Sequence, residues 1–210
     1  MKIEYSHCDD IHSFLRSRSV SRAVLTDILD VPAPPARLMA VWEREMMQQL
    51  NLEAGDVEAL PLARARMRWP DYSACVQAVA DWTRSLGLHD VLANIEIQSE
   101  IALMACRGAR YHHDAEQYGG SAFCNLFLSE DKGLDLHFPN IGLRIPLVRG
   151  TAVVFDTAQP HAVIPRRQGD ADGFKASDFP PELDCSQVFL TWELPIDNAH
   201  VAQALGISFG

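Results

Sequence analysis

The chain has 210 residues, of which 48% are apolar and 22% charged, and its formal net charge is −10. A chain of this length and apolar content can bury a core of its own, which excludes an intrinsically disordered protein. The acidic balance argues against a nucleic-acid-binding protein, because such proteins need a basic surface to neutralise phosphates.

The N-terminal sequence MKIEYSHCDD is acidic and has no apolar signal core. No apolar run reaches the roughly 20 residues that span a bilayer. The five cysteines are an odd number without a C-x-x-C pair, which indicates reduced thiols and not a disulfide framework or a zinc site. We therefore expect a cytoplasmic protein that does not bind membranes.

The first 90 residues have a helical pattern of apolar side chains. The spacing predicts a helix over His12–Leu29 and a second helix that begins after Pro35. A third helix is predicted to follow Asp71, a plausible N-cap, and to end at Gly87. We interpret residues 1–90 as a helical N-terminal support region.

After Asp90 the pattern changes to short apolar segments separated by turn residues. The predicted strands are Ala93–Met104, Ser121–Leu128, Gly133–Phe138, Ile141–Val148, Thr151–Phe155, His161–Pro165 and Ser186–Leu194. This number and spacing of strands is typical of a sandwich or a jelly roll. We therefore predict an α+β protein in which residues 91–210 form a double-stranded β-helix (jelly roll) core. The helical region 1–90 packs on it as part of one integrated domain. The segment Gln168–Asp184 is predicted to be a long exposed loop.

The sequence His112-His113-Asp114 follows a predicted strand and precedes a glycine-rich turn. The two-residue period of a strand points His112 and Asp114 to the same side. His161, which opens a later strand, is the best-placed third ligand. Two histidines and one carboxylate leave about three positions open on an octahedral ion, an arrangement suited to non-haem Fe(II) and O₂ chemistry. The H-x-D pattern is short enough to occur by chance, so a turn-forming polar pair remains the structural alternative.

The chain here resembles the Fe(II)/2-oxoglutarate-dependent dioxygenases, in their prolyl-4-hydroxylase-like branch. The resemblance covers roughly residues 95–195 and rests on Tyr111-His112-His113-Asp114, Lys132-Gly133-Leu134, Gly150–Phe155 and His161-Ala-Val163. It implies that His112, Asp114 and His161 hold iron and that 2-oxoglutarate binds the iron as cosubstrate. It also implies oxidation of a C–H bond with O₂, with release of succinate and CO₂.

The sequence departs from this family at the last strand, where a basic residue usually binds the distal carboxylate of 2-oxoglutarate. Ser186-Gln187 occupy that region. A carboxylate buried without a cationic partner costs several kcal/mol. We therefore expect Arg167, Arg166 or Arg144 to supply the charge, since an arginine fork suits a carboxylate. Tyr111, Asn125 and His137 are predicted pocket residues.

Two alternatives remain at this point. The first is a cupin-like metal dioxygenase or isomerase that uses the same ligands without 2-oxoglutarate. The second is a non-catalytic jelly-roll module that binds a small ligand or a partner. Small-molecule and peptide substrates are both compatible with the sequence, and nothing in it indicates an oligomer.

Overall fold

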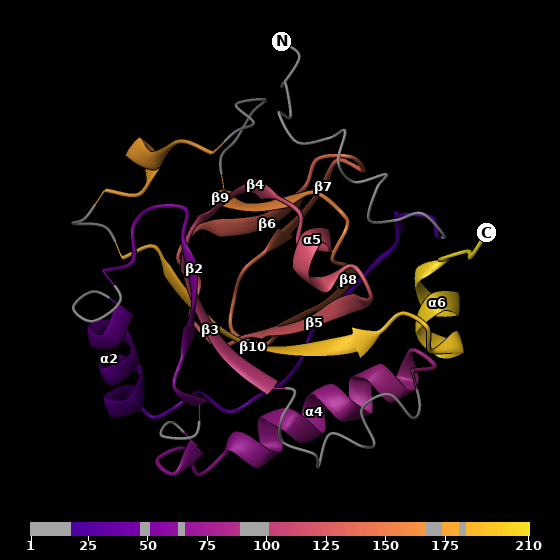
Figure 1. The fold of residues 1–210 in the computed structure, drawn as a ribbon. Coiled ribbons are helices and arrows are strands. Elements are labelled where there is room, and N and C mark those ends of the chain that lie inside the picture. Colours follow the sequence, from indigo (N-terminus) through magenta and orange to yellow (C-terminus); the bar gives the residue numbers. More distant parts are fainter. Residues whose placement is uncertain (1–17, 47–50, 63–65, 89–100, 167–173, 181–183) are drawn as a thin grey trace.

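Two antiparallel sheets face each other in the computed structural model, which describes residues 18–46, 51–62, 66–88, 101–166, 174–180 and 184–210 (Figure 1). The larger sheet has the strand order β1-β8-β5-β10-β3-β2 and the smaller has β4-β9-β6-β7. The strands are β1 (Val24–Ile28), β2 (Val57–Leu60), β3 (Ile101–Arg107), β4 (Ala109–His112), β5 (Ser121–Phe127), β6 (Leu134–Phe138), β7 (Leu143–Pro146), β8 (Thr151–Asp156), β9 (His161–Pro165) and β10 (Ser186–Pro195). This is the predicted α+β jelly roll.

Strand β10 runs through the middle of the larger sheet, between β5 and β3, and it shows how the two faces differ. Its even-numbered residues, including Val188, Leu190 and Trp192, belong to the core beneath the helices. Phe189 belongs instead to the core between the two sheets. Successive side chains of a strand point to opposite faces, so β10 contributes to both cores.

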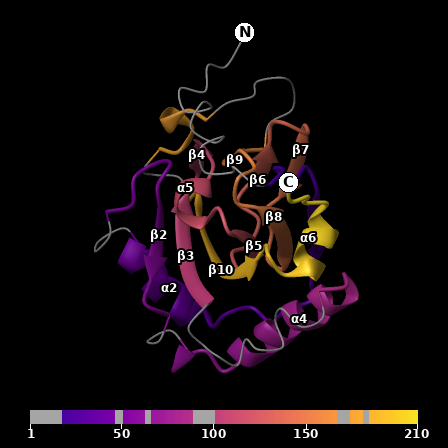
Figure 2. The same cartoon turned by 45° about the vertical axis from the view of Figure 1, so that its right-hand side comes forward.

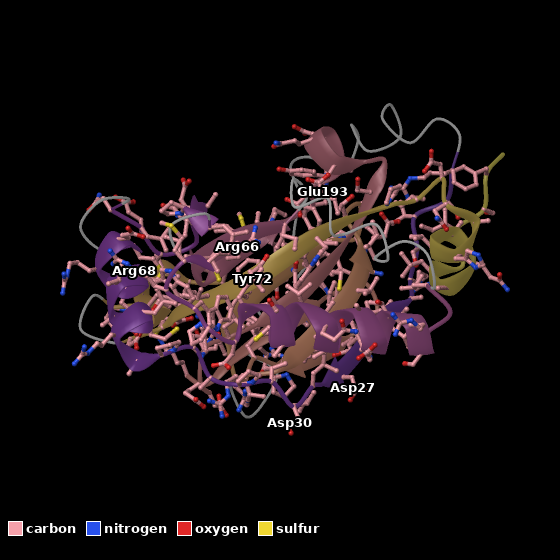
Figure 3. All side chains as sticks on the ribbon, turned by 90° about the horizontal axis from the view of Figure 1, so that it is seen from below. Asp27, Asp30, Arg66, Arg68, Tyr72 and Glu193 are labelled. Atoms are coloured by element: carbon pink, nitrogen blue, oxygen red, sulfur yellow. The ribbon has the colours of Figure 1, made fainter. Side chains whose placement is uncertain are left out.

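The helices cover the outer face of the larger sheet (Figures 1 and 2). They are α2 (Ala36–Arg44), α4 (Tyr72–Ser85) and α6 (Ala199–Leu205), while the short α5 (Ala115–Tyr118) connects β4 to β5. Arg66 and Tyr72 lie close together in Figure 3. The guanidinium carbon of Arg66 lies 4.8 Å from the ring centre of Tyr72, the first residue of α4. The helix predicted after Asp71 is confirmed, and Gly87 follows it with a φ of 83°.

The prediction of a helix over His12–Leu29 is wrong for its described part. Val24–Ile28 forms β1, which pairs with β8, and the residues before Arg18 lie outside the described part. Strand β2 was not predicted and pairs with β3. The N-terminal region therefore extends the larger sheet at both edges, because hydrogen bonds to β8 and β3 override a short helical apolar pattern.

In the segment Gln168–Asp184, predicted to be an exposed loop, residues 175–177 and Asp184 are exposed but Phe179 is buried. Residues 167–173 and 181–183 lie outside the described part, but between them a 3₁₀ helix (Ala176–Asp178) leads to the buried Phe179. Arg107 donates to the Phe179 carbonyl at 2.9 Å. Gly108 has a φ of 65°, and a Cβ there would lie 2.4 Å from the Phe179 ring, so this contact requires glycine.

Cys75, Cys106, Cys124 and Cys185 are buried and free. Cys8 lies outside the described residues. Among the described residues no helix is both long and apolar enough to cross a membrane.

Candidate metal centre

The two candidate histidine ligands are brought together by strand pairing in the smaller sheet. His112 at the end of β4 is the register partner of His161 at the start of β9. Their ring centres are 4.4 Å apart. A bulge between Ala109 and His112 adjusts the register just before the site.

Asp114 follows β4 and reaches the same point. Its backbone N–H donates to the carbonyl of Thr157 at 2.8 Å, which ties it to the turn between β8 and β9. The Thr157 hydroxyl in turn donates to the carbonyls of Tyr118 and Ser121, at 2.7 and 2.8 Å. Asp114 is also the N-cap residue of α5, but its side chain makes no capping bond, so the carboxylate is left for another partner.

The turn before His161 is fixed by a buried ion pair. Asp156 is fully buried and accepts a hydrogen bond from Arg18 at 2.8 Å. Its carboxylate also accepts from the backbone N–H groups of Ser21 and Ala158, both at 2.9 Å. These bonds hold the backbone that leads into β9.

The three ligand groups converge at one point. One donor atom from each of His112, Asp114 and His161 lies within 4.8 Å of the others. The two Nε2 atoms lie 3.6 Å from the oxygens of Asp114. An octahedral ion with bonds of about 2.1 Å places adjacent ligand atoms about 3.0 Å apart. Small side-chain shifts of the ligands therefore suffice to hold a metal ion.

Backbone carbonyls orient both imidazoles. His112 Nδ1 lies 2.6 Å from the Arg110 carbonyl, and His161 Nδ1 lies 3.0 Å from the Gln159 carbonyl. A carbonyl accepts only, so each Nδ1 carries the proton and each Nε2 has its lone pair toward the centre. Metal-binding histidines are oriented in this way in proteins.

The electrostatics of the site favour a bound cation. Burial, together with the nearby His112, lowers the pKa of His161 to about 3, so His161 is neutral at physiological pH. Burial raises the pKa of Asp114, an effect that His112 and His113 partly oppose. A metal ion would offset the cost of burying the Asp114 charge. The residues therefore fit a divalent metal in chemistry and in position.

A cavity of about 280 Å³ opens beside the three ligands. Its lining is mainly apolar and includes Met104, Cys106, Ala109, Phe123, Phe127, Leu136, Phe155, Val163 and Phe189, with Asn125 and Thr191 as polar groups and Gln117, Tyr118 and Glu193 nearer the surface. Gln117 and Glu193 are exposed, whereas Cys106, Leu136 and Phe189 are buried. The cavity therefore has an open mouth at Glu193. Its inner end lies at Cys106, where the exposed Val57, the register partner of Cys106 on β2, also borders it.

The predicted pocket residues separate into two groups. Asn125 lines the cavity, where its Oδ1 accepts from the Thr191 hydroxyl. Tyr111 and His137 contact each other instead, with Tyr111 Oη 2.6 Å from His137 Nδ1. In the register of the smaller sheet His137 alternates with the buried Leu136 and Phe138, so it faces away from the cavity.

Two of the three arginines predicted to bind the cosubstrate, Arg144 and Arg166, do not line the cavity. Arg166 Nε donates to Asp135 at 2.7 Å, and its Nη1 donates to Asp131 at 2.8 Å. Arg144 Nη1 lies 3.7 Å from the second oxygen of Asp135. Both arginines thus lie beside Asp135 on β6. This position does not suit the predicted role of binding the distal carboxylate of 2-oxoglutarate. Arg167 lies outside the described residues.

Several residues at the cavity were not predicted. Thr191 and Glu193 line the cavity from β10 at every second position, together with Phe189. The two-residue period of a long last strand is the signal that indicates them, once one member of the series is known to face the cavity.

No family model matches the sequence, and the search of curated proteins finds no relative. Among solved structures the chain is similar to EvdO2 from Micromonospora carbonacea var. aurantiaca, with 14% identity, a TM-score of 0.45 and coverage of 93% of this chain and 92% of that one. It is also similar to the collagen prolyl hydroxylase of Paramecium Bursaria Chlorella virus-1, solved as a 2OG complex (10%, TM-score 0.41, coverage 81% and 94%). A third is the prolyl-4-hydroxylase of Pseudomonas putida (16%, TM-score 0.40, coverage 89% and 96%).

These matches include prolyl hydroxylases, the branch that the sequence motifs resemble.

Proposed function

We propose that the chain is an Fe(II)- and 2-oxoglutarate-dependent oxygenase that oxidises a C–H bond of an organic substrate. The observation that carries the proposal is the convergence of two Nε2 atoms and one carboxylate at the side of a mainly apolar cavity. Two histidines and a carboxylate on one face leave positions for other ligands, which is the arrangement of non-haem Fe(II) oxygenases.

His112, Asp114 and His161 would hold the iron. When bound, iron with 2-oxoglutarate supplies the oxidation of a C–H bond by O₂, with succinate and CO₂ as co-products. The backbone carbonyls of Arg110 and Gln159 keep the imidazoles in the binding orientation throughout. Asp114 contributes a negative charge that reduces the net charge of a bound divalent ion.

The apolar lining of the cavity also contributes to the proposed function. Phe123, Phe155 and Val163 surround the ligands with side chains that carry no polar group. Such a lining excludes water from the reacting atoms and offers few groups that compete with the substrate. The mouth between α5 and the end of β10 would admit the substrate, a small molecule or a peptide side chain.

The test is anaerobic titration of the iron-loaded protein with 2-oxoglutarate, followed in the visible region. A metal-to-ligand charge-transfer band is expected in the wild type and should be absent in His161→Ala. A wild-type spectrum that does not change with 2-oxoglutarate would remove this cosubstrate from the function.

A second candidate is a metal dioxygenase in which the substrate itself binds the iron. The observation that favours it is the lining: within the described residues, no lysine or arginine borders the cavity. O₂ consumption without succinate formation would identify this function.

A further inference from the structure

Gln187 on β10 is a buried amide without partners. It has no exposed surface. Within the part of the chain that the structure describes, neither its Oε1 nor its Nε2 has a hydrogen-bond partner. An amide in this state destabilises the folded protein, because it has lost water and gained no replacement. A ligand that supplies the missing partner would explain why the residue is there.

The sheet register directs this side chain to the inner end of the cavity. Gln187 lies two residues before Phe189, and Phe189, Thr191 and Glu193 all line the cavity. Its direct cross-strand partner on β3 is Cys106, which also lines the cavity. Directly paired residues share a face of the sheet. The amide therefore lies just beyond Cys106 and Phe189, at the end opposite the mouth.

A positive charge lies close to the same end. Lys132 Nζ donates to Asp184 at 2.7 Å and to the hydroxyl of Ser186, the neighbour of Gln187, at 3.2 Å. Burial raises the pKa of the Cys106 thiol to about 12, and the charge of Lys132 acts against this rise. The ammonium group, although paired with Asp184, thus acts on Cys106 at the inner end of the cavity without lining the cavity itself.

On this basis we infer that Gln187 binds the distal carboxylate of 2-oxoglutarate, donating from Nε2, and that the field of Lys132 favours an anion there. The inference rests on the proposed function and assigns to Gln187 the role expected of an arginine. A keto acid bound at the metal centre and extending inward along Val163 would bring its far end toward Gln187. The chain would then bind the distal carboxylate with the amide of Gln187 on the last strand. The positive charge would come from Lys132 in the segment before β6.

The test compares two keto acids on the iron-loaded protein without O₂. 2-Oxoglutarate and 2-oxopentanoate share the metal-binding end and the chain length, but 2-oxopentanoate ends in a methyl group. The charge-transfer band gives the affinity of each. The wild type should prefer 2-oxoglutarate, and Gln187→Leu should reduce this preference about 10-fold, as expected for a lost hydrogen bond to a charged group. Gln187→Glu should reduce it further, while the affinity for 2-oxopentanoate stays within about twofold in both variants.

Thermal unfolding of the metal-free protein provides a second readout. Because the amide has no partner, Gln187→Leu and Gln187→Met should melt at or above the wild-type temperature. A lower melting temperature in both would indicate a structural role for the amide. Lys132→Met should weaken 2-oxoglutarate binding but not 2-oxopentanoate binding, and His200→Ala on α6 is the matched control that changes neither.

The outcomes separate the inference from the proposed function. An unchanged preference in Gln187→Leu and Gln187→Glu, with a normal band, overturns the inference and leaves the oxygenase intact. Equal weakening of both keto acids overturns it as well, since it shows a general disturbance of the cavity. No band with either keto acid in the wild type refutes the 2-oxoglutarate-dependent function, and the role of Gln187 with it.

Discussion

His112 and His161 face each other directly across β4 and β9, with ring centres 4.4 Å apart, although four strands separate them in the chain. Each is held by a carbonyl two residues before it, from Arg110 and Gln159. The backbone hydrogen bonds that build the smaller sheet therefore also position the site. Metal binding should depend on these ligands and on the turn that leads into β9.

Removal of a ligand should abolish tight metal binding. We expect His161→Ala and Asp114→Ala to lower the affinity for Fe(II) or Ni(II) by more than the roughly 10–100-fold that loss of an outer hydrogen-bond partner costs. Calorimetric titration and metal analysis of the purified variants measure this. His200→Ala, an exposed histidine on α6, should bind as the wild type does. Equal affinity in all three variants would place the metal elsewhere.

Asp114→Asn should separate stability from metal binding. Burial raises the pKa of Asp114, which means that the folded protein disfavours its charge. A neutral amide of the same shape should leave the metal-free protein as stable as the wild type or more so. Saturating Ni(II) at about 100 times its Kd should stabilise the wild type by about 2.7 kcal/mol and should not stabilise the variant. Denaturant unfolding with and without Ni(II) is the measurement, and a marked loss of stability in metal-free Asp114→Asn would contradict the prediction.

The buried histidine should make the metal-free protein sensitive to acid. The pKa of His161 is about 3 in the folded state and 6.5 ordinarily, so between these values the unfolded chain takes up a proton that the folded chain does not. The free energy of unfolding should therefore fall as the pH falls below 6.5, by up to about 1.4 kcal/mol per pH unit. Asp114 acts in the opposite direction just above pH 3.8, because its pKa is raised in the folded state.

The single variant Asp114→Asn lacks the contribution of Asp114, and the double variant Asp114→Asn, His161→Asn lacks the contributions of both residues. The free energy of unfolding, measured from pH 7.5 to 5, should fall with acid in the single variant. It should change less with pH in the double variant. Parallel profiles would show that His161 is not the group responsible.

The ion pair behind the site should be important for folding. Arg18 and Asp156 are 6% and 0% exposed in their side chains and lie 2.8 Å apart. Arg18→Met leaves the Asp156 charge buried without its cation, and we expect a loss of about 3–5 kcal/mol in the free energy of unfolding. The exposed pair Arg84–Asp81 offers a control, since Arg84→Ala should change stability by less than about 0.5 kcal/mol. Similar effects of the two substitutions would show that burial of the pair is unimportant.

Most strands after residue 120 were readable because they are short apolar segments that end in turn residues, whereas β4 (Ala109–His112) was not predicted. His161–Pro165 is predicted at its observed bounds, and β10 differs by one residue. The N-terminal strands were not readable in this way. Val24–Ile28 is a short edge strand whose apolar residues also fit a helix, and only hydrogen bonding to β8 decides between the two.

The sequence by itself determined the choice of the three candidate ligands, because the H-x-D spacing near a strand end and a histidine opening a later strand are local features. The tertiary structure decided which charged and polar groups meet the cavity. Arg144 and Arg166 pair with Asp135, a contact between β6 and its surroundings that no local pattern reveals. Gln187 lies opposite Cys106 because β10 pairs with β3 in the middle of the larger sheet, with alternate residues on each face. Which side chains contact each other in this way depends on which strands lie side by side. The order of the strands is a property of the whole fold.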